Sequence, residues 1–218
     1  MSKVTAILLM LGIPVQPTEP VVNINPSKTP SLISQVENLG GTWLTLDICS
    51  PEAELASFVE KATDVYGRID VLVNNAGYAL LGAFESFSDA ECRSIMETNF
   101  FGPLALCRIL IPTMRERREG TIVNMSSTAG IEAKPSRSLY SASKFAVEAF
   151  SEALFDELAP FNIRVLLVEP GAFRTNFADN LNLPAKPLPD DYKGMATEAA
   201  LNGVKAMQEG EGMKGFKG

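Results

Sequence analysis

Tyr140 and Lys144 are the two side chains in this sequence whose types and spacing could do chemistry together. They stand four residues apart in a stretch whose apolar residues recur at helical intervals, and residues i and i+4 project from one face of a helix. A free Tyr titrates near pH ~10, but a neighbouring positive charge favours its phenolate. We therefore predict that Tyr140 transfers a proton to or from a bound molecule. An exposed Tyr and Lys at this spacing are also common on helices, so the pair alone does not establish catalysis.

Ser127 is a third candidate, and it precedes Tyr140 by thirteen residues. It follows residues 121–125, which are mainly β-branched or apolar and predict a short buried strand, whereas the pattern from Ser138 onward predicts a helix. A hydroxyl at a strand end that faces the start of a helix can hydrogen-bond a substrate carbonyl or hydroxyl.

Strand and helix alternate along most of the chain. The predicted strands cover residues 4–13, 21–25, 42–47, 69–73, 121–125 and 163–168, and the predicted helices cover 31–39, 51–66, 138–159 and 197–207. Ser50 is the predicted cap of the second helix, and Ser88 with Glu91 predicts a capping box that opens a long helical stretch. Pro103 and Pro112 must bend or divide that stretch. The alternation predicts an α/β fold with a Rossmann-like, doubly wound parallel sheet in a single domain over residues 1–218.

Composition narrows the classes of function. The net charge is −7, which argues against nucleic-acid binding. The chain has no His, which removes imidazole bases and the commonest metal ligand, so we predict no metal site. Three widely spaced cysteines favour a reducing compartment, and no window approaches the roughly 18 apolar residues of a membrane span. We expect a cytoplasmic protein without a membrane span.

Several motifs follow one another in a fixed order. They are N-N-A-G at residues 74–77, M-E-T-N-F-F-G around Asn99, Ser127, Y-x-x-x-K at 140–144 and P-G-A-F-R-T at 170–175. In this order the chain resembles the short-chain dehydrogenase/reductase family over about residues 32–177. The resemblance implies an NAD(P)-dependent oxidoreductase that interconverts a carbonyl and a secondary alcohol by hydride transfer.

The resemblance also assigns roles to the candidate residues. It implies that Tyr140 is the proton donor or acceptor and that Ser127 orients the substrate. Lys144 would bind the nicotinamide ribose and lower the pKa of Tyr140, and Asn99 would hold a water in a proton relay.

A dinucleotide site along the carboxyl ends of the strands is implied as well. Asp47 matches the acidic residue beside the adenine, N-N-A-G the adenine-side motif, and P-G-A-F-R-T the loop beside the nicotinamide amide. The implied cofactor-binding residues are Asp47, Asn74, Ala76, Gly77, Tyr140, Lys144, Pro170, Gly171, Phe173 and Thr175.

Residues 1–30 depart from the family pattern. The family expects T-G-x-x-x-G-x-G, but Gly12 is the single glycine before Gly40, and five prolines between residues 14 and 30 exclude a regular helix there. The first strand-helix unit is therefore predicted to be degenerate, and residues 178–218 are predicted to be a shortened substrate lid. The alternative is a catalytically impaired or inactive binding or interaction protein, or a truncated gene product.

The sequence gives weaker signals for the choice of cofactor, the substrate and the oligomeric state than for the family. Lys28 is the cation nearest the second predicted strand, and Asn23 and Asn25 offer no carboxylate, so NADP is favoured over NAD. A small carbonyl or alcohol is the expected substrate. The family often pairs subunits through the helices that match residues 88–119 and 138–159, so a homo-dimer or tetramer is expected.

Overall fold

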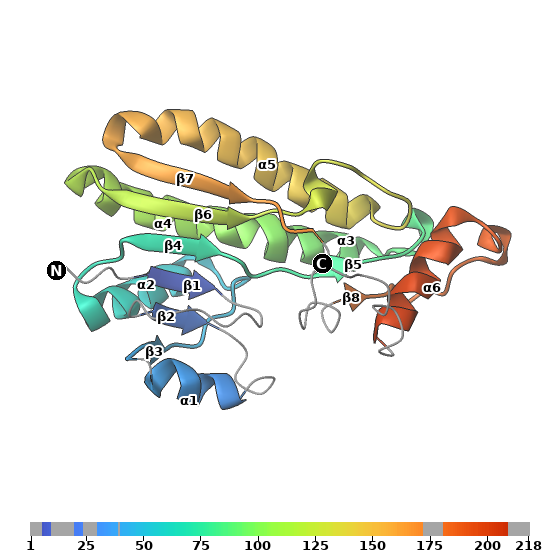
Figure 1. Cartoon of the computed structure of the whole chain (residues 1–218), viewed down its shortest axis with the longest axis horizontal. Helices are drawn as coiled ribbons and strands as arrows, with labels where there is room; N and C mark the ends of the chain where they lie inside the picture. Colours follow the sequence, from blue (N-terminus) through green and yellow to red (C-terminus); the bar gives the residue numbers. More distant parts are fainter. Residues whose placement is uncertain (1–5, 10–19, 24–29, 39, 172–180, 209–218) are drawn as a thin grey trace.

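The main sheet has six parallel strands in the order β3-β2-β1-β4-β6-β7 (Figure 1). The computed structural model of the chain describes residues 6–9, 20–23, 30–38, 40–171 and 181–208. Its strands are β1 (Ala6–Leu9), β2 (Pro20–Asn23), β3 (Thr42–Trp43), β4 (Val71–Asn74), β6 (Gly120–Met125) and β7 (Ile163–Val168). The order reverses between β1 and β4, as in doubly wound α/β folds, so the predicted parallel sheet is confirmed.

The described strands lie close to their predicted positions except for β3, and the outer residues of the predicted strands 4–13 and 21–25 lie outside the described residues. β7 has the predicted bounds, and β4 and β6 differ from the prediction by one or two residues at an end. β3 ends at Trp43 and not at the predicted Asp47. Among the described residues β3 pairs with β2 at Thr42 and Trp43 alone, and the chain then enters a turn in which Asp47 accepts hydrogen bonds from Cys49 N at its side chain (2.9 Å) and from Ser50 N at its carbonyl (3.0 Å).

The helices also follow the predicted order. They are α1 (Pro30–Asn38), α2 (Glu52–Tyr66), α3 (Asp89–Met96), α4 (Gly102–Arg117), α5 (Ser138–Leu158) and α6 (Ala196–Gln208). The capping box is confirmed, since Ser88 Oγ accepts from Glu91 N and the Glu91 carboxylate accepts from Ser88 N. The predicted Ser50 cap is wrong, because Pro51 occupies the N-cap of α2 and no side chain bonds the first turn.

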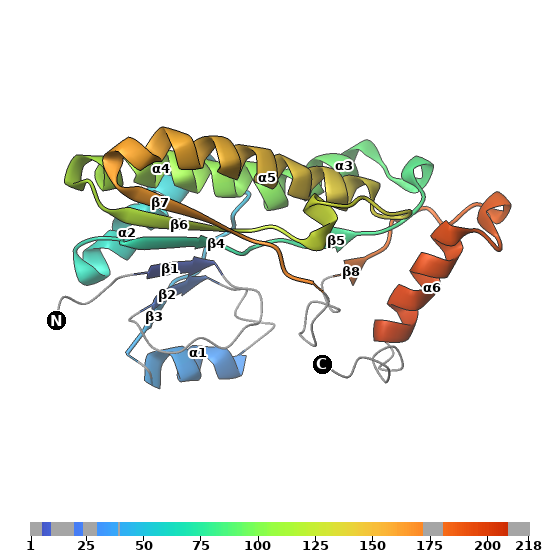
Figure 2. The ribbon, with the colours of Figure 1, turned by 45° about the horizontal axis from the view of Figure 1, so that its top comes forward.

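One hydrophobic core lies between the sheet and the helices α2, α4 and α5. Leu72, Ile122 and Val165 stand side by side in the strand register and are buried in this core. Leu55 of α2 and Leu110 of α4 pack into the same core. Figure 2 shows α4 and α5 on one side of the sheet and α1 on the other side, next to β2 and β3.

The chain from Asp89 to Arg117 is one continuous helical run. A π-helical turn, η2 (Glu97–Phe101), divides it just before Pro103. By length and composition alone this run could cross a membrane, which differs from the expectation that no window comes close. A core helix of a soluble protein passes the same test, and Leu106 and Met114 are fully buried here.

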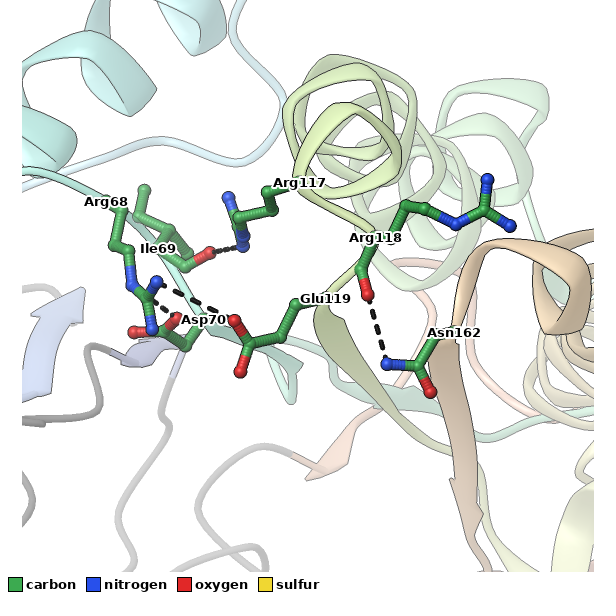
Figure 3. Close-up of polar contacts among 7 residues, drawn as sticks. All are labelled: Arg68, Ile69, Asp70, Arg117, Arg118, Glu119 and Asn162. Atoms are coloured by element: carbon green, nitrogen blue, oxygen red, sulfur yellow. Dashed lines mark hydrogen bonds and ion pairs between the residues drawn. The ribbon is translucent and has the colours of Figure 1, made fainter.

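A cluster of arginines ties the amino ends of the central strands together (Figure 3). Arg68 pairs with Asp70 (2.8 Å) and reaches Glu119 (3.6 Å), while Arg117 donates to the Ile69 carbonyl. A further bond in the same view joins the end of α4 to the residue before β7. These contacts give the basic residues at the end of α4 a structural role, and they lie at the opposite end of the strands from Ser127.

A second, two-stranded parallel sheet was not predicted. It pairs β5 (Ala79–Leu80) with β8 (Leu181–Asn182). The segment after β8 is held to the same region, because Tyr192 Oη donates to Glu85 (2.8 Å) and Ala185 N donates to Glu91 (2.9 Å). The segment between β8 and α6 is thereby joined to the residues around β5 and α3.

Candidate active site

Ser127 and Tyr140 lie together where β6 ends and α5 begins. Ser127 is the N-cap of a short 3-10 turn (Thr128–Gly130), and its Oγ accepts from Ala129 N (3.2 Å). Tyr140 lies in the first turn of α5 with 7% of its surface exposed, and the Ser127 hydroxyl hydrogen-bonds its phenol oxygen. The structure thus brings two of the predicted residues into direct contact at the carboxyl edge of the sheet.

Burial raises the pKa of Tyr140 above its ordinary value, while the Ser127 hydrogen bond and the charge of Arg137 lower it. The Lys144 ammonium lies nearby, since its Nζ donates to Met125 O (2.7 Å) and stands 6.0 Å from the centre of the Tyr140 ring. In the chain without ligands the pKa of Tyr140 lies above its ordinary value, because loss of water around the phenolate outweighs the effects that lower it.

Lys144 is almost completely buried although it carries an ammonium. Its exposed fraction is 6%. Burial lowers its pKa to about 8, against the opposing effect of the Glu148 carboxylate one turn further along α5. An ammonium has three donors, and among the described residues Met125 O is the acceptor that meets it. The remaining donor capacity suits the hydroxyl groups of a ligand.

The lowered pKa of Lys144 predicts a pH-dependent contribution to stability. In the unfolded chain this Lys keeps its proton up to pH about 10.5, whereas in the fold it loses it near pH 8. Between these values the unfolded chain binds more protons, so rising pH stabilises the fold. We expect the free energy of unfolding of the native chain, relative to Lys144→Met, to rise by at most about 3 kcal/mol from pH 8 to 10.5. Urea unfolding at several pH values measures this difference.

The matched control is Lys61→Met, which removes an exposed ammonium from α2. Its stability relative to the native chain should stay flat over the same pH range. A flat difference for Lys144→Met as well would show that Lys144 is not desolvated in the folded chain.

Asn99 lies in the π-helical turn η2, and its side chain is fully engaged. Its Oδ1 accepts from Tyr78 N (3.0 Å), and its Nδ2 donates to Tyr78 O (2.9 Å) and to Ser143 Oγ (3.0 Å). A Cβ at Gly77 would stand 3.0 Å from Asn99 Oδ1 and 3.7 Å from Lys144 Nζ. Glycine therefore permits the close approach of the N-N-A-G segment to Asn99, whose amide positions that segment.

Ser143 is a residue that the sequence reasoning missed. It is completely buried, accepts from Asn99 Nδ2, and donates to the Tyr140 carbonyl (2.7 Å). It thereby joins the turn that carries Asn99 to the first turn of the helix that carries Tyr140. The available signal was a Ser inside a predicted helix next to Lys144. Such a Ser commonly bonds the carbonyl of the preceding turn.

The Asn74 side chain makes structural hydrogen bonds between neighbouring strands. Its side chain is 4% exposed and donates to Asn124 Oδ1 (2.8 Å) and to Cys107 Sγ (3.3 Å). Asn124 in turn donates to Ser151 Oγ (2.8 Å). The Asn74 amide nitrogen thus ties β4 to β6, and through Asn124 to α5, while its buried Oδ1 has no hydrogen-bond partner among the described residues.

The other residues assigned to the cofactor are more scattered. Ala76 packs partly against the core, and Asp47 is exposed with its carboxylate bonded in the turn after β3. Pro170 O accepts from Thr128 N (3.3 Å), and a Cβ at Gly171 would meet nothing within 4 Å. Phe173 and Thr175 lie outside the described residues, as do residues 1–5, 10–19 and 24–29 of the atypical segment predicted over residues 1–30.

The described residues offer little metal or thiol chemistry outside this site. In the described ranges, no group of three or more His, Cys, Asp or Glu residues could hold a metal ion. Cys49, Cys92 and Cys107 are free thiols, and burial raises the pKa of Cys107 to about 12. A buried thiol with so high a pKa is a poor nucleophile.

Comparison with known proteins identifies one family of relatives. A family model described as short chain dehydrogenase matches residues 18–186. An oxidoreductase of Passalora fulva, claN, is 49% identical over 154 residues, which cover 70% of this chain and 69% of that protein. A 3-ketodihydrosphingosine reductase of Bacteroides thetaiotaomicron is 44% identical over 147 residues, and the match spans 67% of this chain and 55% of the relative.

Solved structures of oxidoreductases also superpose on this chain. A short-chain dehydrogenase from Streptomyces avermitilis superposes with a TM-score of 0.76 and 34% identity, covering 90% of this chain and 69% of that one. A metagenomic short-chain oxidoreductase in complex with NADP gives 0.65 and 28%, with 72% of each chain covered. An NAD+-bound xylitol dehydrogenase gives 0.63 and 26%, covering 70% of this chain and 60% of that one.

Proposed function

Because this chain belongs to the short-chain dehydrogenase family of oxidoreductases, we propose that it interconverts a carbonyl and a secondary alcohol with NADP(H) as the hydride carrier. The observation that carries the proposal is the hydrogen bond between the Ser127 hydroxyl and the buried Tyr140 phenol, with the Lys144 ammonium one turn away. The inactive-module alternative is not favoured, because the three side chains remain assembled at the carboxyl edge of the sheet.

The residues at this edge fit a nicotinamide dinucleotide in two respects. Lys144 presents a buried ammonium with donor capacity for ribose hydroxyls, and a Cβ at Gly171, three residues after β7, would meet no atom of the described residues within 4 Å. Structural neighbours were solved with NADP or with NAD+ bound, which supports a nicotinamide dinucleotide here. The bound nicotinamide supplies or accepts the hydride at the substrate carbon.

In the direction of reduction, the chain supplies the proton. The Tyr140 hydroxyl gives its proton to the substrate oxygen and becomes a phenolate, while the Ser127 hydroxyl holds the same oxygen in place. The Lys144 ammonium stabilises the phenolate electrostatically when it also holds the ribose. In the direction of oxidation, the phenolate takes the proton back from the alcohol.

The proposed relay water belongs on the backbone of Asn99. Its amide is already bonded to Tyr78 and Ser143. The α-helical partner of its carbonyl would be the N–H of residue 103, which is Pro103 and has none. A carbonyl oxygen has two lone pairs, so this one can accept from a water that returns a proton to Tyr140 even where the π-helical turn offers it the N–H of Leu104.

A spectrophotometric assay tests the proposal. The full chain is mixed with NADPH or NADH and a panel of aliphatic and aromatic ketones and aldehydes, and nicotinamide absorbance is followed. Consumption of cofactor with one alcohol formed per cofactor oxidised is the expected result. If the cofactor binds in a fluorescence titration but no member of the panel, in either direction, changes its oxidation state, the binding-module alternative replaces the proposal.

NADPH should bind more tightly than NADH. The Lys28 ammonium is the group expected to bind the 2′-phosphate of NADPH. Lys28→Ala should therefore weaken NADPH binding by about tenfold, the effect of losing one charge-assisted hydrogen bond. NADH has no 2′-phosphate, so its binding should be unchanged. Titrations of nicotinamide fluorescence measure both constants. Lys61→Ala is the matched control and should change neither. Tighter binding of NADH by the native chain would overturn the cofactor assignment.

A further inference from the structure

Residues 181–187 lie directly on the backbone that follows the N-N-A-G motif. β8 pairs with β5, and the pairing continues where Leu81 N donates to Asn182 O (2.9 Å). A Cβ at Gly82 would stand 2.8 Å from Pro184 Cγ, so glycine permits the close approach of the two segments. Figure 1 shows this pair of strands beyond the carboxyl end of β4. The segment is therefore placed by backbone contacts and not by loose surface packing.

The same backbone leads to the start of α5. Gly82 N donates to the Ser136 carbonyl (2.9 Å), and Ser136 precedes Tyr140 by four residues. Leu80 of β5 is buried in one apolar cluster with Tyr140, and Leu181 of β8 packs against that cluster. The segment that contains β8 and the residue that carries the phenol thus belong to one packed unit beside the candidate active site.

The Glu91 carboxylate joins this segment to the start of α3. Its Oε2 accepts from Ser88 N (2.7 Å) and Ser88 Oγ (2.7 Å), and its Oε1 accepts from Ala185 N (2.9 Å). A capping box needs only the contact with the N-cap residue, so the bond to Ala185 is an additional one. Hydrogen bonds from the Ser88 backbone, the Ser88 hydroxyl and the Ala185 backbone lower the pKa of Glu91 below its ordinary value. The carboxylate is therefore ionised at neutral pH.

We propose that Glu91 is a positioning residue for the substrate: its two carboxylate oxygens bind the start of α3 and the Ala185 backbone at once, and so fix residues 181–187 as one wall of the substrate pocket. This inference rests on the proposed function, because a carbonyl or alcohol must bind beside Tyr140. Glu91 does not touch the reacting atoms and acts through the segment that it holds. A carboxylate suits this role, since an ionised acceptor makes a stronger hydrogen bond than a neutral one.

Glu91→Gln separates the two roles of this side chain. The single Gln oxygen should remain with Ser88, because that contact is local and needs no ordering of a distant segment. The Gln NH2 group then faces the N–H of Ala185, and two donors cannot bond each other. Ala185→Pro removes the same bond from the other side, since proline has no N–H. Ser88→Ala is the matched control, because it removes the side chain that caps α3 and leaves the bond between Glu91 and Ala185.

Amide hydrogen exchange of the full chain, followed by NMR, tests whether Glu91 holds the segment, and it needs no turnover. The reporter is the Leu81 N–H, which is bonded to the segment, and the reference is the Gly82 N–H, which is bonded to the residues before α5. Leu81 should exchange on the order of tenfold faster in Glu91→Gln and Ala185→Pro, the effect of one charge-assisted hydrogen bond on a local opening. Gly82 should be unchanged. Ser88→Ala should leave Leu81 unchanged, although its thermal midpoint should fall by a few degrees.

Steady-state kinetics test the effect on the substrate. In Glu91→Gln and Ala185→Pro the KM for the carbonyl substrate should rise several-fold, while kcat and the dissociation constant of NADPH stay unchanged, because the groups that move the proton are untouched. The proposal is overturned if Leu81 exchanges alike in Glu91→Gln and the native chain, if Ser88→Ala reproduces both effects, or if KM is unchanged where exchange has risen. A native chain that reduces no carbonyl would refute the proposed function and with it the substrate role, while the Leu81 exchange rate would show separately whether Glu91 holds the segment.

Discussion

We expect Tyr140→Phe to lower the rate of carbonyl reduction on the order of 10²- to 10⁴-fold, the range that a positioned proton donor contributes. The variant should keep its fold, because the ring stays in an apolar cluster with Ala129 and Leu201 and one oxygen is removed. Cofactor affinity should be nearly unchanged. The measurements are the turnover number at saturating cofactor, a fluorescence titration of the cofactor, and a thermal unfolding curve.

The control is Tyr66→Phe, which removes a phenol bonded to the Gly40 carbonyl (2.9 Å) beside β3. It should turn over like the native chain. Turnover of Tyr140→Phe within a few-fold of the native value would mean that the proton reaches the substrate by another route, and Ser127 would be the next residue to test.

Local signals were sufficient to predict most helices and strands. The apolar run of β7, the capping box at Ser88 and the helix that carries Tyr140 and Lys144 all depend on residues close together in the sequence. The contact between Ser127 and Tyr140 was also foreseeable, since the end of a strand and the start of the next helix meet at one edge of a parallel sheet.

Contacts between distant segments could not be predicted in this way. The pairing of β5 with β8 joins short segments about one hundred residues apart, and neither has a distinctive pattern. The inward direction of Asn74 depends on Asn124, which lies fifty residues later on the neighbouring strand. The raised pKa of Tyr140 is a further example, because burial by the tertiary fold outweighs the local charge pattern.

The connection between β1 and β2 is where the largest change in cofactor affinity is expected. These strands pair with each other and β1 pairs with β4, so the scaffold for a phosphate-binding turn is present. Residues 10–19 contain one glycine and two prolines, and ten residues are fewer than the dozen or more of a crossover with a helix. The sequence therefore does not supply the glycine turn and helix end that bind pyrophosphate.

Replacing residues 10–19 by a G-x-x-x-G-x-G turn and a helix should strengthen dinucleotide binding. Two charge-assisted backbone bonds to the pyrophosphate, at roughly 1.5 to 3 kcal/mol each, give about 3 to 6 kcal/mol, or on the order of 10²- to 10⁴-fold in affinity. Calorimetric titrations of the native and grafted chains with the same cofactor at one salt concentration measure the gain. A graft of equal length with its glycines replaced by valine is the control, since valine blocks the approach of the backbone but keeps the helix. Equal affinities of all three chains would mean that the native N-terminal segment already holds the phosphates, and the weak-binding expectation would be abandoned.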